Sequence, residues 1–377
     1  MEELVGIYDG VHQTPDYQDS GIMFLSVENI ATLKSEKYIS EEAFERDYKV
    51  YPEKGDILMT RIGDVGTTNV VETAEKVAFY VSLALLKPNE IDSYFLSNAM
   101  KTNAFQKGLR ERTLVTAIPQ KINKDEIGKI DIFITNNDEE QKKIGAYFSN
   151  LDHLITFHQR KCEQTKKLKK YMLQKMFPKE GQTVPEVRFE GFTDAWEKRK
   201  LLGCIKKITD FRGRTPKKLG MDWSENGYLA LSALNVKNGY IDFNQDVHYG
   251  NQELYDRWMS GNELHKGQVL FTTEAPMGNV AQVPDNNKYI LSQRTIAFDV
   301  KSEIISEDFL ATILRTPNVI NDLIALASGG TAKGVSQKSL SALTIKIPSN
   351  IAEQSKIAEY FQNLDHLITL HQRKYKN

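Results

Sequence analysis

Residues 140–161 read EQKKIGAYFSNLDHLITFHQRK, and residues 353–374 read EQSKIAEYFQNLDHLITLHQRK. The two stretches are identical at 17 of 22 positions in an ungapped alignment, a match that chance does not produce. The chain therefore contains an internal duplication. Two unrelated surface helices of similar composition are the alternative, which this identity disfavours.

Each stretch has the apolar spacing of a long amphipathic helix. The steps of three and four residues are those of a heptad seam. The predicted seam residues are Phe148, Leu151, Ile155 and His158 in the first copy and Phe361, Leu364, Ile368 and His371 in the second. The first helix is predicted over residues 138–179, about 60 Å at 1.5 Å per residue. A rod of this length with one apolar seam needs a partner, which the second copy supplies.

Composition sets the broad class. The chain has 377 residues, a net charge of −1 and two cysteines, Cys162 and Cys204. This length suggests two or three domains. Two cysteines exclude a disulfide framework and a cysteine zinc site, and no signal peptide or membrane-spanning run is evident. We expect a cytoplasmic protein whose nucleic-acid contacts, if any, come from local patches.

The globular parts repeat more weakly. Residues 9–15 align with 210–216, 24–30 with 230–236, 54–60 with 266–272, and the pair Gln120-Lys121 with Gln337-Lys338. Strands are predicted at 22–27, 56–60, 77–87 and 130–135, and a helix at 93–107. The helices of the duplication are therefore similar while the globular domains differ. This indicates a shared framework whose two globular domains recognise different things.

At this point the chain resembles the specificity subunit of a type I restriction–modification system. The resemblance rests on the paired YF-x-NLDHLIT-x-HQRK helices, KKLKKYMLQKMFP at 166–178, VPEVRFEGFTDAWEKRKL at 184–201 and the two Thr-Pro turns. It implies a mixed α/β fold with two target-recognition domains, an antiparallel pair of long coiled-coil-like helices and a pseudo-twofold internal repeat. The implied domains are 1–135 and 181–350 for recognition, with spacer helices at 136–180 and 351–377.

The resemblance also implies the function. The subunit is non-catalytic, each recognition domain reads one half of a bipartite site in double-stranded DNA, and the helices set the gap. Two modification (methyltransferase) subunits dock on it, and restriction subunits join through the complex. S-adenosylmethionine and ATP are expected on those partners, with no cofactor or metal on this chain. The first half has no counterpart of residues 187–201 and the last helix none of 165–177, so both edges are expected to be incomplete.

A basic run marks the candidate DNA contact. Residues 198–218 hold nine Lys and Arg and one acid, Asp210, and phosphate contacts supply most sequence-independent affinity. Arg212 and Arg214 suit guanine, lysines suit phosphates, and Gln suits adenine. The predicted DNA-binding residues are His12, Gln13, Thr14, Asn29, Arg61, Gln120, Lys121, Arg212, Arg214, Thr215, Lys217, Lys218, Asn235, Lys333, Gln337 and Lys338. Alternatively the run is a solvated face, and Asn29 and Asn235 satisfy turn backbone.

Other motifs are weaker. The loop at 329–336 lacks the lysine of a P-loop, and is either a DNA-facing loop or a plain connector. Asp16 and Asp47 imitate a nuclease pattern, but the second half has no acid at the position of Asp16. His158 and His371 favour seam packing over metal binding. No methyltransferase motif occurs. The chief rival function is a protein-interaction scaffold without DNA binding, which would not need the basic run.

Overall fold

The computed structural model describes residues 1–327 and 334–376, with side chains described as far as Lys374. The chain divides into two compact units, residues 1–156 and residues 157–377, which are considered separately. Both are mixed α/β, as the sequence predicts. The dividing point lies inside one long helix, and the domain boundaries predicted from the sequence remain predictions.

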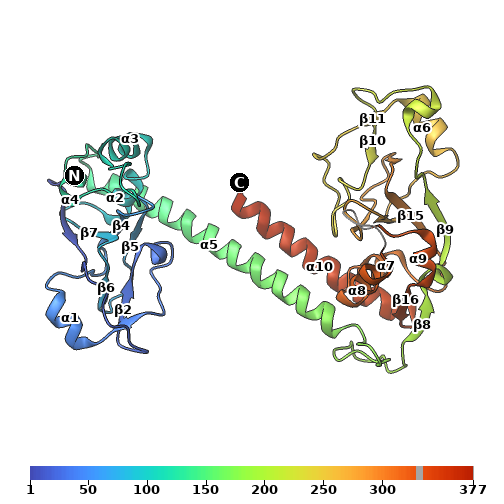
Figure 1. Cartoon of the computed structure of the whole chain (residues 1–377), viewed down its shortest axis with the longest axis horizontal. Helices are drawn as coiled ribbons and strands as arrows, with labels where there is room; N and C mark the ends of the chain where they lie inside the picture. Colours follow the sequence, from blue (N-terminus) through green and yellow to red (C-terminus); the bar gives the residue numbers. More distant parts are fainter. Residues whose placement is uncertain (328–333, 377) are drawn as a thin grey trace. The chain divides into compact units, whose positions relative to one another are not determined.

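Unit 1 contains two sheets (Figure 1, blue to cyan). One is antiparallel, in the order β1 (Val5–Asp9), β7 (Leu83–Pro88), β4 (Ile57–Thr60) and β5 (Thr68–Val70). The other has the order β3 (Tyr38–Ile39), β2 (Ile22–Leu25) and β6 (Val77–Phe79), with β2 and β6 parallel. The helices are α1 (Glu41–Asp47), α2 (Ser93–Ala99), α3 (Asn103–Arg112), α4 (Lys124–Gly128) and the start of α5 (Asp138–Lys175).

Both faces of the larger sheet of unit 1 are buried. Successive residues of a strand point to opposite faces. Accordingly Ile57 and Met59 join one core with the helical residues Leu96 and Phe105, whereas Leu58 joins a second core with Phe79 of the smaller sheet. Strand β4 therefore reads as a continuous apolar run, and the two cores fix the larger sheet between helices and the smaller sheet.

Unit 2 repeats this plan. Its larger sheet has the order β9 (Ile205–Asp210), β15 (Thr295–Val300), β12 (Val269–Thr272) and β13 (Val280–Gln282). Its smaller sheet has the order β11 (Tyr249–Gly250), β10 (Tyr228–Leu231) and β14 (Ile290–Leu291), again with one parallel pair. A two-stranded sheet of β8 (Glu197–Lys200) and β16 (Thr344–Ile347) is added. The helices are α6 (Gln252–Met259), α7 (Glu307–Ile313), α8 (Pro317–Leu326), α9 (Gln337–Ala342) and α10 (Ile351–Lys376).

Within unit 2, the second part of α5 lies antiparallel to α10 (Figure 1, green and red). His158 meets His371 with their Nδ1 atoms 3.0 Å apart, and Lys169 pairs with Asp365 further along. The rings of Phe177 and Phe361 lie 6.0 Å apart. Contacts that rise along one helix and fall along the other define the antiparallel direction.

Three local predictions are wrong. The predicted strand at 130–135 is irregular, and Phe133 is 83% exposed. Its counterpart β16 pairs with β8, whereas no strand equivalent to β8 occurs within residues 1–156, so the segment has no sheet partner. The predicted helix at 93–107 is two helices, and the predicted strand at 77–87 is two strands, because turns interrupt both.

The alignment near residue 120 also needs correction. The Ile122 N–H donates to the Arg61 carbonyl, and the Val335 N–H donates to the equivalent Thr273 carbonyl. Gln337 and Lys338 therefore correspond to Lys124 and Asp125, a shift of four positions from the pair proposed from the sequence. The loop that follows α8 differs in sequence between the halves. No matching residues there could fix where the gap in the sequence alignment belongs.

Candidate nucleic-acid interface

The last part of the basic run, residues 211–218, forms a turn after β9, and the rest of the run lies in β8 and β9 and between them. The 3₁₀ helix Pro216–Leu219 begins with Thr215 as its N-cap, whose hydroxyl accepts from the Lys218 N–H at 3.3 Å. Gly220 ends it with a φ of 72°, which favours glycine. Arg212, Lys217 and Lys218 are exposed on this turn. The turn therefore presents cations to solvent in a fixed order.

Arg214 points inward from the same turn. Its guanidinium lies 4.3 Å from the centre of the Phe211 ring and donates to the Trp258 carbonyl. These contacts hold the turn against α6. Arg214 is half-buried and uses Nη1 within the fold, whereas Arg212 is exposed, so the structure favours Arg212 for the guanine contact and that of Arg214 stays a prediction.

Asp210 gathers two predicted residues at the base of this turn. Arg212 Nη2 lies 3.3 Å from Asp210 Oδ2, and Gln337 Nε2 donates to the same oxygen at 3.1 Å. Gln337 and Lys338, at the start of α9, are exposed. The turn and α9 thus form one surface. Lys333, also predicted to contact DNA, lies outside the described residues.

The equivalent turn of unit 1 exposes different side chains. His12, Gln13 and Thr14 are all exposed after β1. Here the equivalent acid Asp9 pairs with Arg61, which is 7% exposed and whose pKa burial lowers. Burial and the ion pair with Asp9 argue against the predicted DNA contact by Arg61, which stays untested.

Two further predicted residues of unit 1, Gln120 and Lys121, are exposed. Gln120 Nε2 donates to the Gly63 carbonyl at 3.0 Å. Lys121 forms one β-bridge with Ile62 and another with Leu114. They border the loop after β4. Their predicted contact with DNA stays a prediction.

The two predicted asparagines support turns. Asn235 has no exposed surface, and its Oδ1 accepts from the Ser232 N–H at 2.9 Å and lies 3.0 Å from the Ser232 hydroxyl oxygen. Its burial favours the turn role that the sequence left open, and its contact with DNA stays a prediction. Asn29 does the same for Ser26 and donates to the Lys34 carbonyl at 2.9 Å.

The sequence missed a cleft of 370 Å³ beside the basic turn. Trp223, Asp246, His248 and Arg294 line it together with Thr215 and Lys217. These residues come from loops that are far apart in sequence. Only a loop-by-loop alignment of the two halves of the chain could have identified them beforehand. The cleft places aromatic and acidic groups next to the exposed cations.

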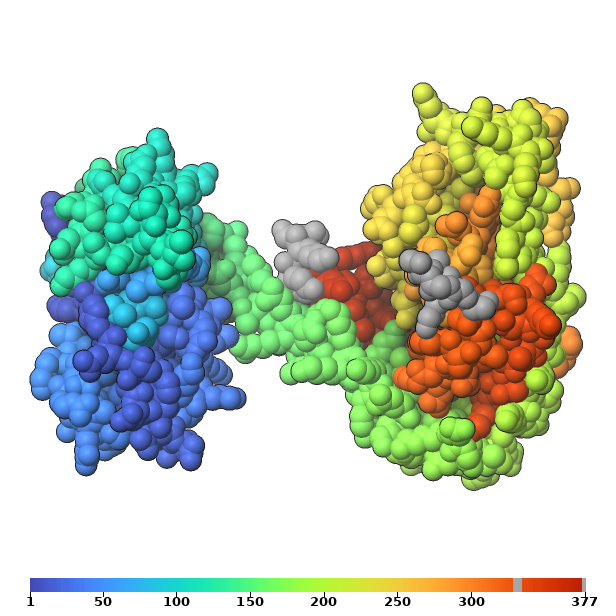
Figure 2. Space-filling view, in the orientation of Figure 1, coloured from blue at the N-terminus to red at the C-terminus, as the bar shows by residue number. Residues whose placement is uncertain are grey.

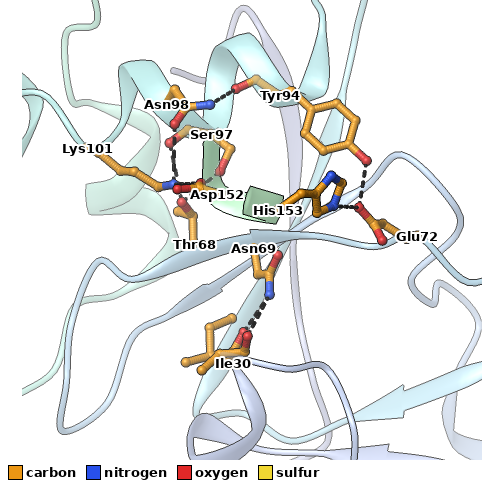
Figure 3. Close-up of polar contacts among 11 residues, drawn as sticks. Ile30, Thr68, Asn69, Glu72, Tyr94, Ser97, Asn98, Lys101, Asp152 and His153 are labelled. Atoms are coloured by element: carbon orange, nitrogen blue, oxygen red, sulfur yellow. Dashed lines mark hydrogen bonds and ion pairs between the residues drawn. The ribbon is translucent and has the colours of Figure 1, made fainter. Parts of the chain in front are cut away.

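The start of α5 is held to unit 1 by polar contacts (Figure 3). Lys101 Nζ lies 3.3 Å from Asp152 Oδ2, and His153 Nε2 lies 3.4 Å from Glu72, which also accepts from Tyr94. Apolar side chains on this part of α5 are exposed, and Figure 2 shows the helix in green on the face in view. They are Tyr147, Phe148, Leu151, Leu154 and Ile155.

The predicted seam is therefore buried in part. Phe361 is fully buried and Leu364 is 6% exposed, while Ile368, His158 and His371 are half-buried. Phe148, Leu151 and Ile155 are 44, 37 and 38% exposed. At these three residues the heptad spacing therefore produces an apolar surface that is exposed to solvent.

Among residues 1–327 and 334–376, no three His, Cys, Asp or Glu side chains gather as a metal site. Over the same residues, no helix is long and apolar enough to cross a membrane.

Comparison with known proteins identifies the family. The model of the type I restriction modification DNA specificity domain matches residues 14–167 and 193–377. The type I restriction enzyme MjaVIII specificity subunit of Methanocaldococcus jannaschii is 27% identical over 245 residues, which cover 63% of this chain and 56% of that protein. The crystal structure of the type I restriction-modification S subunit from M. genitalium covers 100% of this chain and 90% of its own, with a TM-score of 0.67 and 13% identity. The chain belongs to the family of type I restriction–modification DNA specificity proteins.

Proposed function

We propose that the chain is the DNA-recognition subunit of a type I restriction–modification complex, in which each unit reads one half of a bipartite site. One observation carries the proposal. Strands β1 and β9 are the equivalent edge strands of the larger sheets of the two units. The turn after β1 exposes His12 and Gln13, whereas the turn after β9 exposes Arg212 and Lys217. A shared framework with unlike exposed side chains suits two unlike half-sites.

The chain has a recognition role and no catalytic one. Its partners are double-stranded DNA, two modification subunits and, through them, the restriction subunits, all within the cytoplasm. S-adenosylmethionine and ATP belong to those partners. We expect the purified chain alone to transfer no methyl group and cut no DNA, and robust methyl transfer by it would contradict this role.

The exposed apolar residues of α5 support docking. Contiguous apolar surface rimmed by polar residues marks interaction sites. Tyr147, Phe148 and Leu154 of unit 1 are 62, 44 and 54% exposed on a helix whose neighbouring positions include charged residues. The modification subunits would cover this surface.

A scaffold that binds no DNA is the second candidate, and the exposed apolar surface would serve it equally. Random duplexes titrated across a salt series separate the two functions. DNA recognition predicts that the logarithm of the binding constant falls linearly with the logarithm of the salt concentration. Absence of binding at low salt, by a folded chain with its partner present, would leave the scaffold.

The helices are proposed to set the gap between half-sites. One heptad added to each of α5 and α10, inside their paired stretch, keeps the seam in phase and lengthens each by about 10 Å. The preferred gap should then grow by at most about three base pairs, less if the DNA bends. A folded variant that selects the original gap would refute the ruler while leaving recognition intact.

A further inference from the structure

Unit 2 holds an ordered acidic group in the cleft beside its basic turn. Asp246 Oδ2 accepts from the Ser232 hydroxyl at 2.5 Å, and Asp246 Oδ1 lies 3.2 Å from His248 Nε2. The carboxylate is 29% exposed. A carboxylate offers about four acceptor positions, so about two stay available after these contacts. The cleft thus presents a fixed hydrogen-bond acceptor.

The imidazole that orients Asp246 is itself held by an indole. The rings of His248 and Trp223 are stacked, with centroids 5.5 Å apart and planes 21° apart. Trp223 in turn lies 5.8 Å from Trp258 of α6, which is buried. The acceptor is therefore connected through packed rings to the core of unit 2.

Unit 1 has a counterpart at the same place in its backbone. The Phe24 N–H donates to the Lys37 carbonyl at 2.8 Å, and the equivalent Ala230 N–H donates to the His248 carbonyl at 2.9 Å. Lys37 therefore occupies the position of His248.

The aromatic position corresponds as well. Gln18 and Ser224 each donate a backbone bond at 2.8 Å to equivalent strand residues, so Tyr17 occupies the position of Trp223. Lys37 Nζ lies 5.6 Å from the Tyr17 ring centre and 2.6 Å from a Glu28 carboxylate oxygen. Both units place a carboxylate, a polar nitrogen and an aromatic ring together, with different residue types.

Backbone conformation singles out the cleft of unit 2. Left-handed φ values are uncommon outside glycine and gather at functional sites. Such values occur at Asp246 (48°), Ala275 (48°) and Arg294 (65°), all lining this cleft, and at two other non-glycine residues of the described chain. Three of the five non-glycine residues with left-handed φ in the described chain therefore lie at this cleft.

Hydrogen-bonding capacity selects the ligand. The cleft lining balances Asp222 and Asp246 with Lys217 and Arg294, so it has no net affinity for phosphate, whereas Arg212 and Lys218 on the adjoining turn are exposed cations. A carboxylate near DNA pairs with an exocyclic amino group.

We propose that Asp246 reads an exocyclic amino group, cytosine N4 or adenine N6, in the half-site of unit 2, with Ser232 and His248 as positioning residues. The proposal rests on the DNA-recognition function.

The test compares Asp246→Ala with Asp322→Ala, an exposed position on α8 away from the cleft, each as the full chain with its modification partner. Alanine is used because asparagine would keep an acceptor oxygen. Both proteins select sites from a random duplex library. Asp246→Ala should lose its preference at one position of one half-site by about tenfold, since such contacts discriminate by about 1–3 kcal/mol. Asp322→Ala should keep the original preference everywhere.

Chemical deletion of the amino group provides a second readout, on the wild-type chain itself. On the selected site, base analogues lacking the exocyclic amine are placed one at a time. One of them in that half-site should weaken wild-type binding about tenfold, and binding by a folded Asp246→Ala chain should not respond to it. Unchanged preference in Asp246→Ala, equal weakening on all sequences, or no sensitive amine would overturn the proposal. A wild-type chain that selects no site would instead refute the recognition function.

Discussion

The two copies of the duplicated helix motif have nearly the same sequence and very different surroundings. Phe148 is 44% exposed and Leu151 37%, whereas their equivalents Phe361 and Leu364 are 0 and 6% exposed. The copy in unit 2 packs in one core with Met172 and Leu173 of α5, with Met176 and Phe177 just after it, and with Trp196. Within unit 1 the equivalent cover is absent. The motif sequence therefore determines the apolar face of the helix. Whether that face is buried depends on which other segments pack against it.

The polar residues of the motif follow the same rule. Asp152 pairs with Lys101 at the surface, with side chains 60 and 49% exposed. Its equivalent Asp365 pairs with Arg315, at the position matching Lys101, and also with Lys169. One conserved geometry thus serves as a surface ion pair in one copy and as a buried link in the other.

The largest expected difference lies at Glu353. Its carboxylate is 1% exposed and accepts from Arg188 Nε and Nη2 at 2.7 and 2.8 Å and from Trp196 Nε1 at 3.3 Å. Glu353→Gln should destabilise unit 2 by about 3 kcal/mol, because it leaves a buried guanidinium without its counter-ion. Denaturant unfolding measures this.

The matched control is Glu140→Gln in the other copy. Glu140 is exposed and bonds to the Thr135 hydroxyl, so its replacement should cost under about 0.5 kcal/mol. Equal losses in both variants would show that the surroundings do not distinguish the copies.

A smaller difference is expected at the ion pairs. Asp365→Asn should destabilise by about 2 kcal/mol, because Arg315 is 7% exposed at its side chain and burial already lowers the pKa of Lys169. Asp152→Asn should stay within about 0.5 kcal/mol, as exposed pairs usually do. A comparison of thermal midpoints decides this, and a larger loss for Asp152→Asn would reverse the interpretation.

The basic turn separates stability from binding. Arg214→Ala should lower stability by about 1 kcal/mol, since it removes the contact with Phe211 and the bond to Trp258. Arg212→Ala should leave stability unchanged, weaken binding on all sequences and reduce the salt slope by about one if it contacts a phosphate. Melting and salt titration of both variants provide the check, and unchanged binding by Arg212→Ala would remove it from the interface.

The smallest effect concerns pH. Burial, followed by the charges of Lys374 and His371, lowers the pKa of His158 below its ordinary value of 6.5. The unfolded chain therefore takes up this proton first, so stability is full above pH 6.5 and declines as the pH falls below it. His158→Gln should flatten this decline between pH 7.5 and 5.5. An unchanged slope would place the acid sensitivity elsewhere.

Sequence reasoning identified what repetition and spacing encode. The helix seam, the duplicated sheets and the turn after β9 followed from residues such as Phe361 and Thr215. It could not separate Arg212 from Arg214, because only the packing against Phe211 turns one of them inward. Burial of Arg61 and Asn235 likewise depends on partners distant in sequence. The cleft of Trp223 and Asp246 arises from three loops that no linear motif connects.

The central claim is that one framework, used twice, reads two unlike half-sites. Selection of binding sites from a random duplex library, by the full chain with its modification partner, tests this most directly. The account predicts a bipartite site with two different halves separated by a gap of fixed length and variable sequence. A single contiguous site, or two identical halves, would contradict it.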